Sequence, residues 1–213
     1  EGVYQLDIYT HTLSTLAGEG FRLQSVSKDG TAILLNNGNS LYLMKSDGSA
    51  PLLMSESLYP YGEQTAIWTA DEKGVIYIAE QNDGRFLVYD SMDGTEPKRL
   101  TTSDLSPIEV YVSPVIGTVF FGSGECSDYK ACQRTSTYSV MLDGSKQLLM
   151  ENVIDPAIAP GGANFAYNVQ NADTETLSIA TFDRSLDRPV LALGTEDLKY
   201  FYSDYKWSPD GTV

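Results

Sequence analysis

The sequence contains very few of the side chains that most catalytic and metal sites need. Among its 213 residues there are two cysteines and a single histidine, His11. His11 falls at the turn of a predicted N-terminal hairpin, where a solvated residue is expected, and no second histidine offers a Ser-His-Asp or metal arrangement. No Gly-x-Ser-x-Gly elbow or phosphate-cradling loop is present. We therefore expect no catalytic residue, metal ligand or cofactor in this segment, which we predict is not an enzyme.

Basic residues are also scarce. The 14 Lys and Arg side chains are scattered among 29 acidic ones, and the formal net charge is −15. A nucleic-acid binder neutralises phosphates with clustered basic side chains, so we expect no nucleic acid partner. The same charge disfavours anionic membranes and favours a soluble, self-repelling protein or one that meets basic partners.

Long apolar runs are missing as well. No stretch approaches the roughly 20 apolar residues that span a bilayer, so we expect no direct membrane insertion in this segment. The chain has neither an initiating methionine nor a charged-then-apolar leader, because residues 1–4 already resemble folded structure. Two interpretations stay open: a leader has been removed, or the segment is a piece of a longer chain.

What the sequence does contain is a short phrase, an apolar residue followed by a polar turn, that recurs five times. The spacings between successive copies are 42, 44, 46 and 49 residues. A period near 45 residues is typical of a repeat architecture. The copies begin at Val26, Trp68, Val112, Ile158 and Trp207.

A second recurring element lies between the copies. Asp47-Gly48, Asp93-Gly94 and Asp143-Gly144 each separate two short apolar runs, and residues 177–193 form a degenerate fourth copy. Asp-Gly tolerates the positive φ angles of tight hairpin turns, so each pair predicts a hairpin. The spacing of these turns is not that of a calcium loop. One unit is therefore strand, turn, strand, loop, strand, turn, strand, without sustained helical periodicity.

Four short antiparallel strands cannot bury both faces of their sheet alone. Radial stacking of such sheets gives a β-propeller, whereas a β-sandwich, the alternative, does not explain the same four-strand order repeated in sequence. We therefore predict an all-β fold, a β-propeller of four-stranded antiparallel blades, with residues 1–213 forming a single domain or a portion of one. About four complete blades and partial blades at both termini are expected, at residues 3–16 (partial), 21–57, 58–103, 104–151, 152–194 and 200–213 (partial).

The phrase Trp207-Ser208-Pro209-Asp210-Gly211-Thr212, with hairpins such as residues 43–49, resembles the propeller repeat of TolB-type proteins. The resemblance runs the length of the chain, although Val or Ile replaces tryptophan in three copies and two copies lack proline. It implies six blades and hence a longer parent protein. The phrase is also similar to blades of prolyl-oligopeptidase-type proteins, in which the propeller gates a hydrolase domain. WD-repeat propellers match less well, because the Gly-His and Trp-Asp pairs are missing.

The two cysteines, Cys126 and Cys132, flank a polar loop in the third full unit. In an acidic, tyrosine-rich chain, a pair that closes such a loop predicts a disulfide in an exported protein. Free thiols are the alternative. A metal site is disfavoured, since two ligands without a partnering histidine do not hold zinc.

Tyrosines gather in the segments that lead into the first strand of a unit, and another lies in the loop between the cysteines. Exposed tyrosines there would make good binding anchors on one face of the propeller, and packing between neighbouring sheets is the alternative role. The candidate binding surface comprises Tyr59, Tyr61, Tyr129, Tyr200, Tyr202 and Tyr205.

Together these features favour a non-catalytic propeller scaffold that mediates protein–protein or ligand binding in an exported protein, periplasmic or extracellular. A protein partner is expected. Two alternatives stay open: a propeller that gates a hydrolase or peptidase domain located outside this segment, and an extracellular sensor domain of a membrane-anchored protein. The repeats alone do not decide among these, because one fold serves many functions.

Overall fold

The computed structural model describes residues 2–61, 64–111, 117–126, 132–151, 153–162, 164–170, 174–181, 185–194 and 207–208. Strands account for nearly all the regular structure of these residues, joined by one short 3-10 helix, η1 (Ser103–Leu105). In the part of the chain that the structure describes, no helix is long and apolar enough to cross a membrane.

The strands form a hairpin followed by four sheets, and each sheet pairs four antiparallel strands in chain order. The hairpin consists of β1 (Val3–Asp7) and β2 (Thr12–Ala17). The sheets contain, in order, β3 (Arg22–Val26), β4 (Ala32–Asn37), β5 (Ser40–Lys45) and β6 (Leu52–Ser55); β7 (Ala66–Trp68), β8 (Gly74–Gln81), β9 (Gly84–Ser91) and β10 (Lys98–Arg99); β11 (Pro107–Tyr111), β12 (Thr118–Cys126), β13 (Cys132–Met141) and β14 (Lys146–Glu151); and β15 (Val153–Ile158), β16 (Asn164–Gln170), β17 (Thr174–Thr181) and β18 (Asp187–Gly194).

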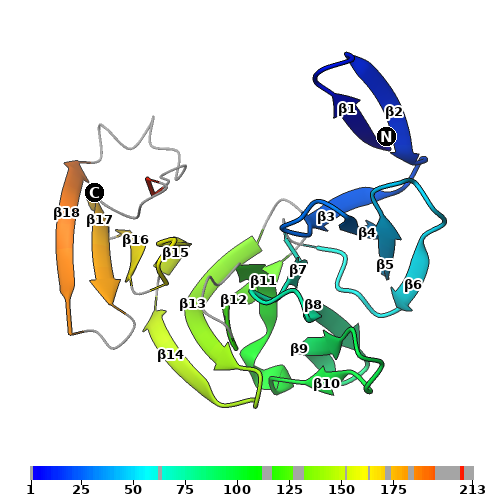
Figure 1. The fold of residues 1–213 in the computed structure, drawn as a ribbon. Helices are drawn as coiled ribbons and strands as arrows, with labels where there is room; N and C mark the ends of the chain where they lie inside the picture. The colour runs from blue at the N-terminus through cyan, green and yellow to red at the C-terminus, as the bar shows by residue number, and fades with distance from the viewer. Residues whose placement is uncertain are drawn as a thin grey trace.

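The four sheets follow one another around an arc, with the first strand of each sheet innermost and the fourth outermost (Figure 1). This is the radial arrangement of a β-propeller, and it confirms the predicted fold class. Of the predicted C-terminal partial blade, only Trp207 and Ser208 lie within the described residues. The Trp207 indole N–H donates a hydrogen bond to the Ala157 carbonyl of β15 (2.9 Å), which places Trp207 beside the fourth sheet.

Apolar clusters fill the interfaces between successive sheets. The second sheet is buried on both sides: Ile76 and Ile78 of β8 belong to the cluster shared with the third sheet, whereas Val75 and Tyr77 belong to the cluster shared with the first. Successive residues of a strand point to opposite faces, so β8 reads as a continuous apolar run rather than an alternating one. A smaller cluster joins Phe120 of the third sheet to the fourth.

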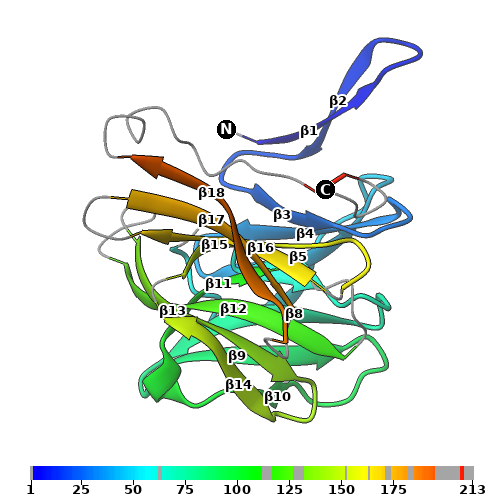
Figure 2. The same ribbon diagram turned by 90° about the vertical axis from the view of Figure 1, so that its left-hand side faces the viewer.

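The N-terminal hairpin is less completely covered. Val3 and Ala17, at its base, are buried against the first sheet. Beyond the base the hairpin projects away from the sheets (Figures 1 and 2). Tyr4, Leu6 and Leu13 expose more than half of their surface, and the register places Leu6 opposite Leu13. One face of the hairpin is therefore apolar and solvent-exposed.

The recurring phrases form the turn between the first and second strands of a sheet, and the Asp-Gly pairs form the turn between the third and fourth. Gly30, Gly48, Gly94 and Gly144 all have positive φ, between 73° and 94°. Because both kinds of turn join antiparallel neighbours in this order, they lie at one end of the sheets. The loops between second and third strands, and the crossings between sheets, lie at the opposite end.

The second copy of the phrase is built differently from the first. Glu72, with φ of 57°, takes the left-handed conformation that Gly30 takes in the first copy. Gly74 instead begins β8, where an added Cβ would lie 2.3 Å from Cε2 of Tyr89. The glycine of this copy therefore permits close packing and does not make the turn.

Replacing Gly30 with alanine tests the turn geometry. No atom lies within 4 Å of a Cβ built at Gly30, so the expected cost comes from the positive φ alone. We expect Gly30→Ala to lower the free energy of unfolding by about 1–2 kcal/mol in urea titrations. Gly18→Ala is the matched control, because Gly18 is equally open and has no positive φ. Equal losses in the two variants would contradict the assigned geometry.

Aspartates in the turns accept hydrogen bonds from their own turns. Asp29 Oδ1 accepts from the Thr31 backbone N–H (2.9 Å) and from the Ser27 hydroxyl (2.7 Å). These bonds favour the charged form and hold the pKa of Asp29 below its ordinary value. Turn hydrogen bonds likewise lower the pKa of Asp47, Asp71, Asp93 and Asp143.

A carboxylate NMR titration should separate these turn aspartates from Asp90. The turn aspartates should titrate below the usual value of about 3.9, whereas burial raises the pKa of Asp90 above it. Because their pKa is lower in the folded state, the turn aspartates stabilise the fold above the unfolded-state pKa. That stabilisation is lost as the pH falls through their folded-state values. Asp90 has the opposite sign: its contribution is present below the unfolded-state pKa and is lost as the pH rises. A common midpoint for Asp29 and Asp90 would contradict this assignment.

Candidate binding surface

Two residues of the predicted tyrosine surface, Tyr59 and Tyr61, lie within the described residues, and they contact each other. Their ring centroids are 5.5 Å apart and the rings meet edge to face. Tyr59 is buried (3% exposed) and Tyr61 is exposed (41%). Tyr59 therefore packs inside the fold, and only Tyr61 offers an aromatic surface to a partner. Tyr129, Tyr200, Tyr202 and Tyr205 lie outside the described residues.

The crossing from the first sheet to the second fixes the position of this pair. The Tyr59 N–H donates to the Ile78 carbonyl (2.8 Å), and the Glu80 N–H donates to the Ser57 carbonyl (2.7 Å). The crossing therefore runs beside the end of β8. Pro60 between the tyrosines has a fixed φ, and a residue that precedes proline favours extended backbone. The two rings are thus carried by a short, extended and hydrogen-bonded segment.

Arg85 connects this crossing to the third sheet. Its guanidinium is nearly buried and lies over the Tyr59 ring, with Cζ 4.8 Å from the centroid. Nη1 donates to the Tyr59 hydroxyl (3.1 Å), while Nη2 donates to the Gly124 carbonyl (2.9 Å) and to Glu125 Oε2 (3.1 Å). Tyr59, Tyr61, Arg85, Gly124 and Glu125 are called the Arg85 cluster below.

The charges of the Arg85 cluster are unequally exposed. The Arg85 side chain is 9% exposed, whereas that of Glu125 is 80% exposed. A buried guanidinium needs several acceptors, and a carbonyl, a phenol and a carboxylate supply them. Burial also raises the pKa of the Tyr59 hydroxyl, so this hydroxyl stays protonated at neutral pH. What the cluster presents to solvent is the Tyr61 ring beside the Glu125 carboxylate.

The cysteines lie next to the Arg85 cluster. Cys126 ends β12 and Cys132 begins β13, and the register places the two residues opposite each other. Residues directly opposite in an antiparallel pair have Cα atoms about 4.5–5.5 Å apart. This separation lies within the range that a disulfide spans. The backbone arrangement is therefore compatible with the predicted bridge, which stays a prediction.

Arg85 is the functional residue that the sequence did not reveal. Its acceptors lie 39 and 40 residues further along the chain, in another sheet. A single arginine in a strand has the same appearance whether it faces solvent or bridges two sheets. The repeat period of about 45 residues is the one usable signal, since it predicts that such positions come together in neighbouring blades.

The described residues offer little for catalysis. His11 has a positive φ of 56° in the turn of the exposed hairpin, as the sequence suggested for a turn residue. Among the described side chains, no group of three His, Cys, Asp or Glu comes together in a way that could hold a metal ion. The geometry of the Arg85 cluster suits recognition rather than bond making or breaking.

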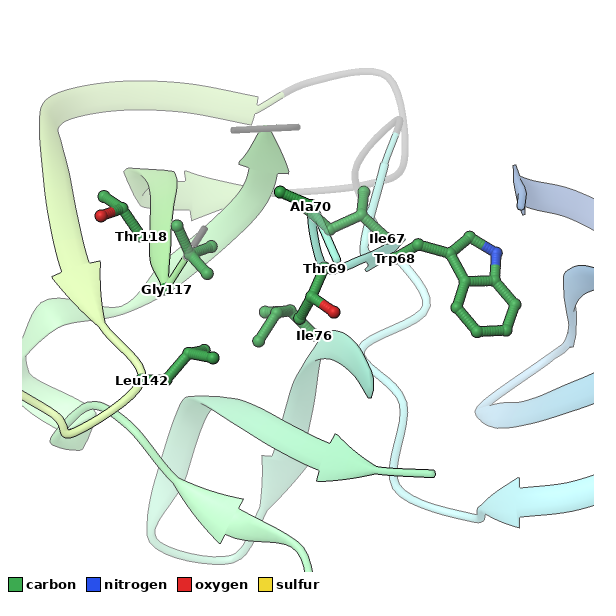
Figure 3. A pocket seen from close by; sticks show the side chains of 9 residues that line it. Ile67, Trp68, Thr69, Ala70, Ile76, Gly117, Thr118 and Leu142 are labelled. Atoms are coloured by element: carbon green, nitrogen blue, oxygen red, sulfur yellow. The ribbon is translucent and has the colours of Figure 1, made fainter. Parts of the chain in front are cut away.

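A small hollow lies between the second and third sheets, at the end that carries the turns (Figure 3). Its empty space measures about 240 Å³, including the part open to solvent. Ligand pockets typically reach about 300–1,000 Å³. Trp68 contributes to the wall but directs its indole away from the other lining side chains. The hollow is too small to serve as a ligand site. Its walls include Ile67, Thr69, Ile76, Gly117, Val119 and Leu142.

The sheets, their order and their radial packing define this protein as a TolB-like β-propeller. TolB from Acinetobacter baumannii is similar in structure, with a TM-score of 0.62 and 20% sequence identity over 89% of this chain and 48% of that one. The chain thus spans about half the length of that TolB. At this identity the likeness establishes the fold.

Propellers of other named proteins are equally similar. Dipeptidyl peptidase 4 from Porphyromonas gingivalis gives a TM-score of 0.60 at 16% identity, over 88% of this chain and 29% of that one. Oligogalacturonate lyase from Vibrio parahaemolyticus gives 0.63 at 12% identity, over 87% and 58%. No protein-family model and no curated protein sequence matches the chain.

Two arginine–carboxylate pairs in the second sheet allow a matched test of the Arg85 cluster. Arg85 and Arg99 each lie 3.1 Å from a carboxylate oxygen, but the Arg99 side chain is 46% exposed. Removing Arg85 leaves the Gly124 carbonyl without this donor, so we expect Arg85→Met to cost about 3 kcal/mol in the free energy of unfolding.

The exposed pair should matter less. Arg99→Met is expected to cost about 1 kcal/mol or less, because solvent screens the pair and only the stacking on Phe86 is lost. Urea titrations of both variants measure the difference. Equal losses would show that Arg85 does not fasten the two sheets together.

Proposed function

We propose that this propeller is a non-catalytic scaffold that binds a protein partner through the surface around Tyr61 and Glu125. The observation that carries the proposal is the contrast in exposure within the Arg85 cluster. A buried arginine and a buried tyrosine hold an exposed tyrosine and an exposed carboxylate in place. Function commonly resides in such sites grafted on a rigid fold.

The exposed groups suit protein recognition. Tyrosine is enriched among the residues that dominate binding energy, because its ring offers a large contact area with few rotatable bonds. Tyr61 loses less freedom on binding than an unsupported side chain would, since it already packs on Tyr59. A carboxylate beside the ring favours a partner with a basic or hydrogen-bond-donating group at that position.

An exported location, periplasmic or extracellular, is part of the same proposal. It is supported by the predicted Cys126–Cys132 bridge, whose residues the register places opposite each other. Structural disulfides persist in oxidising compartments and are rare in the cytosol. The net charge of −15 is compatible with a soluble exported protein.

A second candidate function is a propeller that accompanies a hydrolase domain. Its support is the likeness to Porphyromonas gingivalis dipeptidyl peptidase 4, of which the chain covers 29%. The full-length open reading frame decides between the two functions. If the frame encodes no α/β segment that bears a serine, an aspartate and a histidine in catalytic order, the hydrolase function is excluded.

Site-specific photo-crosslinking tests the scaffold function in the native host. A photoreactive phenylalanine analogue at Tyr61 or at Glu125 should form adducts with one protein partner. Tyr9 is the matched control, because it is also a tyrosine and is 91% exposed, on the projecting hairpin. Adducts at all three positions would indicate non-specific contact, and their absence at Tyr61 and Glu125 would count against the proposed surface.

The identified partner then allows an affinity measurement. Tyr61→Ala should weaken binding about tenfold or more, the effect of losing an aromatic anchor. Tyr9→Ala should leave the dissociation constant unchanged. Unfolding curves of both variants establish that the fold itself is intact, because each replaces an exposed side chain.

A further inference from the structure

The ladder between β12 and β13 is interrupted close to its end. The register shifts between Ser123 and Gly124, and three residue pairs follow this irregularity. A β-bulge leaves a residue unpaired and weakens the ladder locally. The last three pairs, residues 124–126 with residues 132–134, are called the β12–β13 tip below. The tip is therefore joined to its own sheet less firmly than the rest of the two strands.

Contacts from outside the ladder hold this tip. Arg85 of the second sheet donates to the Gly124 carbonyl and to Glu125. The Gly124 N–H donates to the Ser106 carbonyl (3.1 Å), in the segment that enters the third sheet. The predicted Cys126–Cys132 bridge would close the outermost pair of the tip. The acceptors of Arg85 thus lie one and two residues from a potential covalent link.

We propose that the Cys126–Cys132 bridge and the Arg85 contacts are coupled, so that the redox state of the cysteines controls how firmly the second sheet is attached to the third. This inference rests on the disulfide of the proposed function. With the bridge closed, the tip holds Gly124 and Glu125 at fixed positions. A guanidinium has a rigid fork of donors, so it bonds well only to acceptors that are fixed in this way.

Reduction would release the tip. A dithiol attacks the bridge through its thiolate, the sulfur–sulfur bond breaks, and a mixed disulfide forms. The second thiol of the reductant then closes its own disulfide, so two electrons and two protons pass to Cys126 and Cys132, which become thiols. The outermost pair of the ladder can then fray, as ladder ends do when few contacts hold them. Arg85 keeps its donors but loses acceptors of fixed position.

The coupling would reach the proposed binding surface. Glu125 belongs to both the tip and the exposed part of the Arg85 cluster, and Tyr61 packs on the tyrosine that Arg85 covers. A reducing environment would therefore loosen the surface that a partner meets. An oxidising one would keep it ordered.

Coupling is reciprocal, which makes it measurable from the cysteines. If the bridge strengthens the Arg85 contacts, these contacts must make the bridge harder to reduce. In dithiothreitol redox buffers, with thiols alkylated and counted by mass spectrometry, we expect Arg85→Met to shift the reduction equilibrium toward thiols by about fivefold or more. Arg99→Met is the control, and it should shift the equilibrium by less than about twofold.

The outcomes separate the two proposals. If the oxidised native protein carries no Cys126–Cys132 bridge, the predicted disulfide is wrong and the coupling is wrong with it, while the crosslinking test of Tyr61 stands independently. If the bridge exists but Arg85→Met and Arg99→Met shift it equally, the disulfide stands and the coupling is overturned.

A measurement on the unmodified chain keeps the test valid should Arg85→Met not fold. Reduction should speed hydrogen exchange at the Gly124 N–H, which lies in the tip. The Leu87 N–H, which donates to Thr101 Oγ1 within the second sheet (2.9 Å), serves as the internal control. Equal effects of reduction on the two amides would overturn the coupling, and a selective effect at Gly124 would support it.

Discussion

Burial of both faces of each sheet is the constraint on which this structure depends. A four-stranded sheet built from apolar runs has two faces to hide from water, and one neighbour hides only one of them. The second sheet satisfies the requirement completely, because β8 directs Ile76 and Ile78 to one neighbour and Val75 and Tyr77 to the other. The hydrophobic contribution is about 25 cal/mol for each Å² of apolar surface buried. It is collected at the sheet interfaces, so the radial order of the sheets follows from their composition.

Polar contacts at the inner ends of the interfaces add specificity to this apolar packing. Between the first and second sheets, the Gln24 side chain accepts hydrogen bonds from the Thr65 backbone and hydroxyl (3.1 and 3.2 Å) and donates to Asn36 (3.2 Å). Between the second and third, Arg85 has the corresponding role with more and stronger bonds. Apolar surfaces slide over one another at small cost, whereas a buried polar group tolerates few positions. These contacts therefore fix how far each sheet is displaced along its neighbour, and the exposed Tyr61 inherits its position from the second of them.

The sequence predicted the strand order well because that order depends on local chemistry. Asp-Gly pairs require positive φ, and the recurring phrase marks a turn wherever it occurs, so the four-strand unit could be derived without tertiary information. Glu72 and Gly74 show the limit of this reasoning, since the glycine of that phrase serves packing against Tyr89 and a glutamate makes the turn. The candidate surface was harder still. Tyr59 and Tyr61 are two residues apart and equally aromatic, yet one is buried and one exposed. What separates them is Arg85, whose contacts in the third sheet no local pattern encodes.

Each apolar cluster described above joins sheets that are adjacent along the chain. An assembly with nearest-neighbour contacts behaves as a linear array, in which stability is approximately a sum over units and over the interfaces between them. Damage at one interface is then expected to stay local, and evolution can alter one blade without redesigning the others. The unequal copies of the phrase are compatible with this freedom. Trp68, Val112 and Ile158 occupy the same place in successive units, so each interface can be tuned by its own residue while the common backbone is retained.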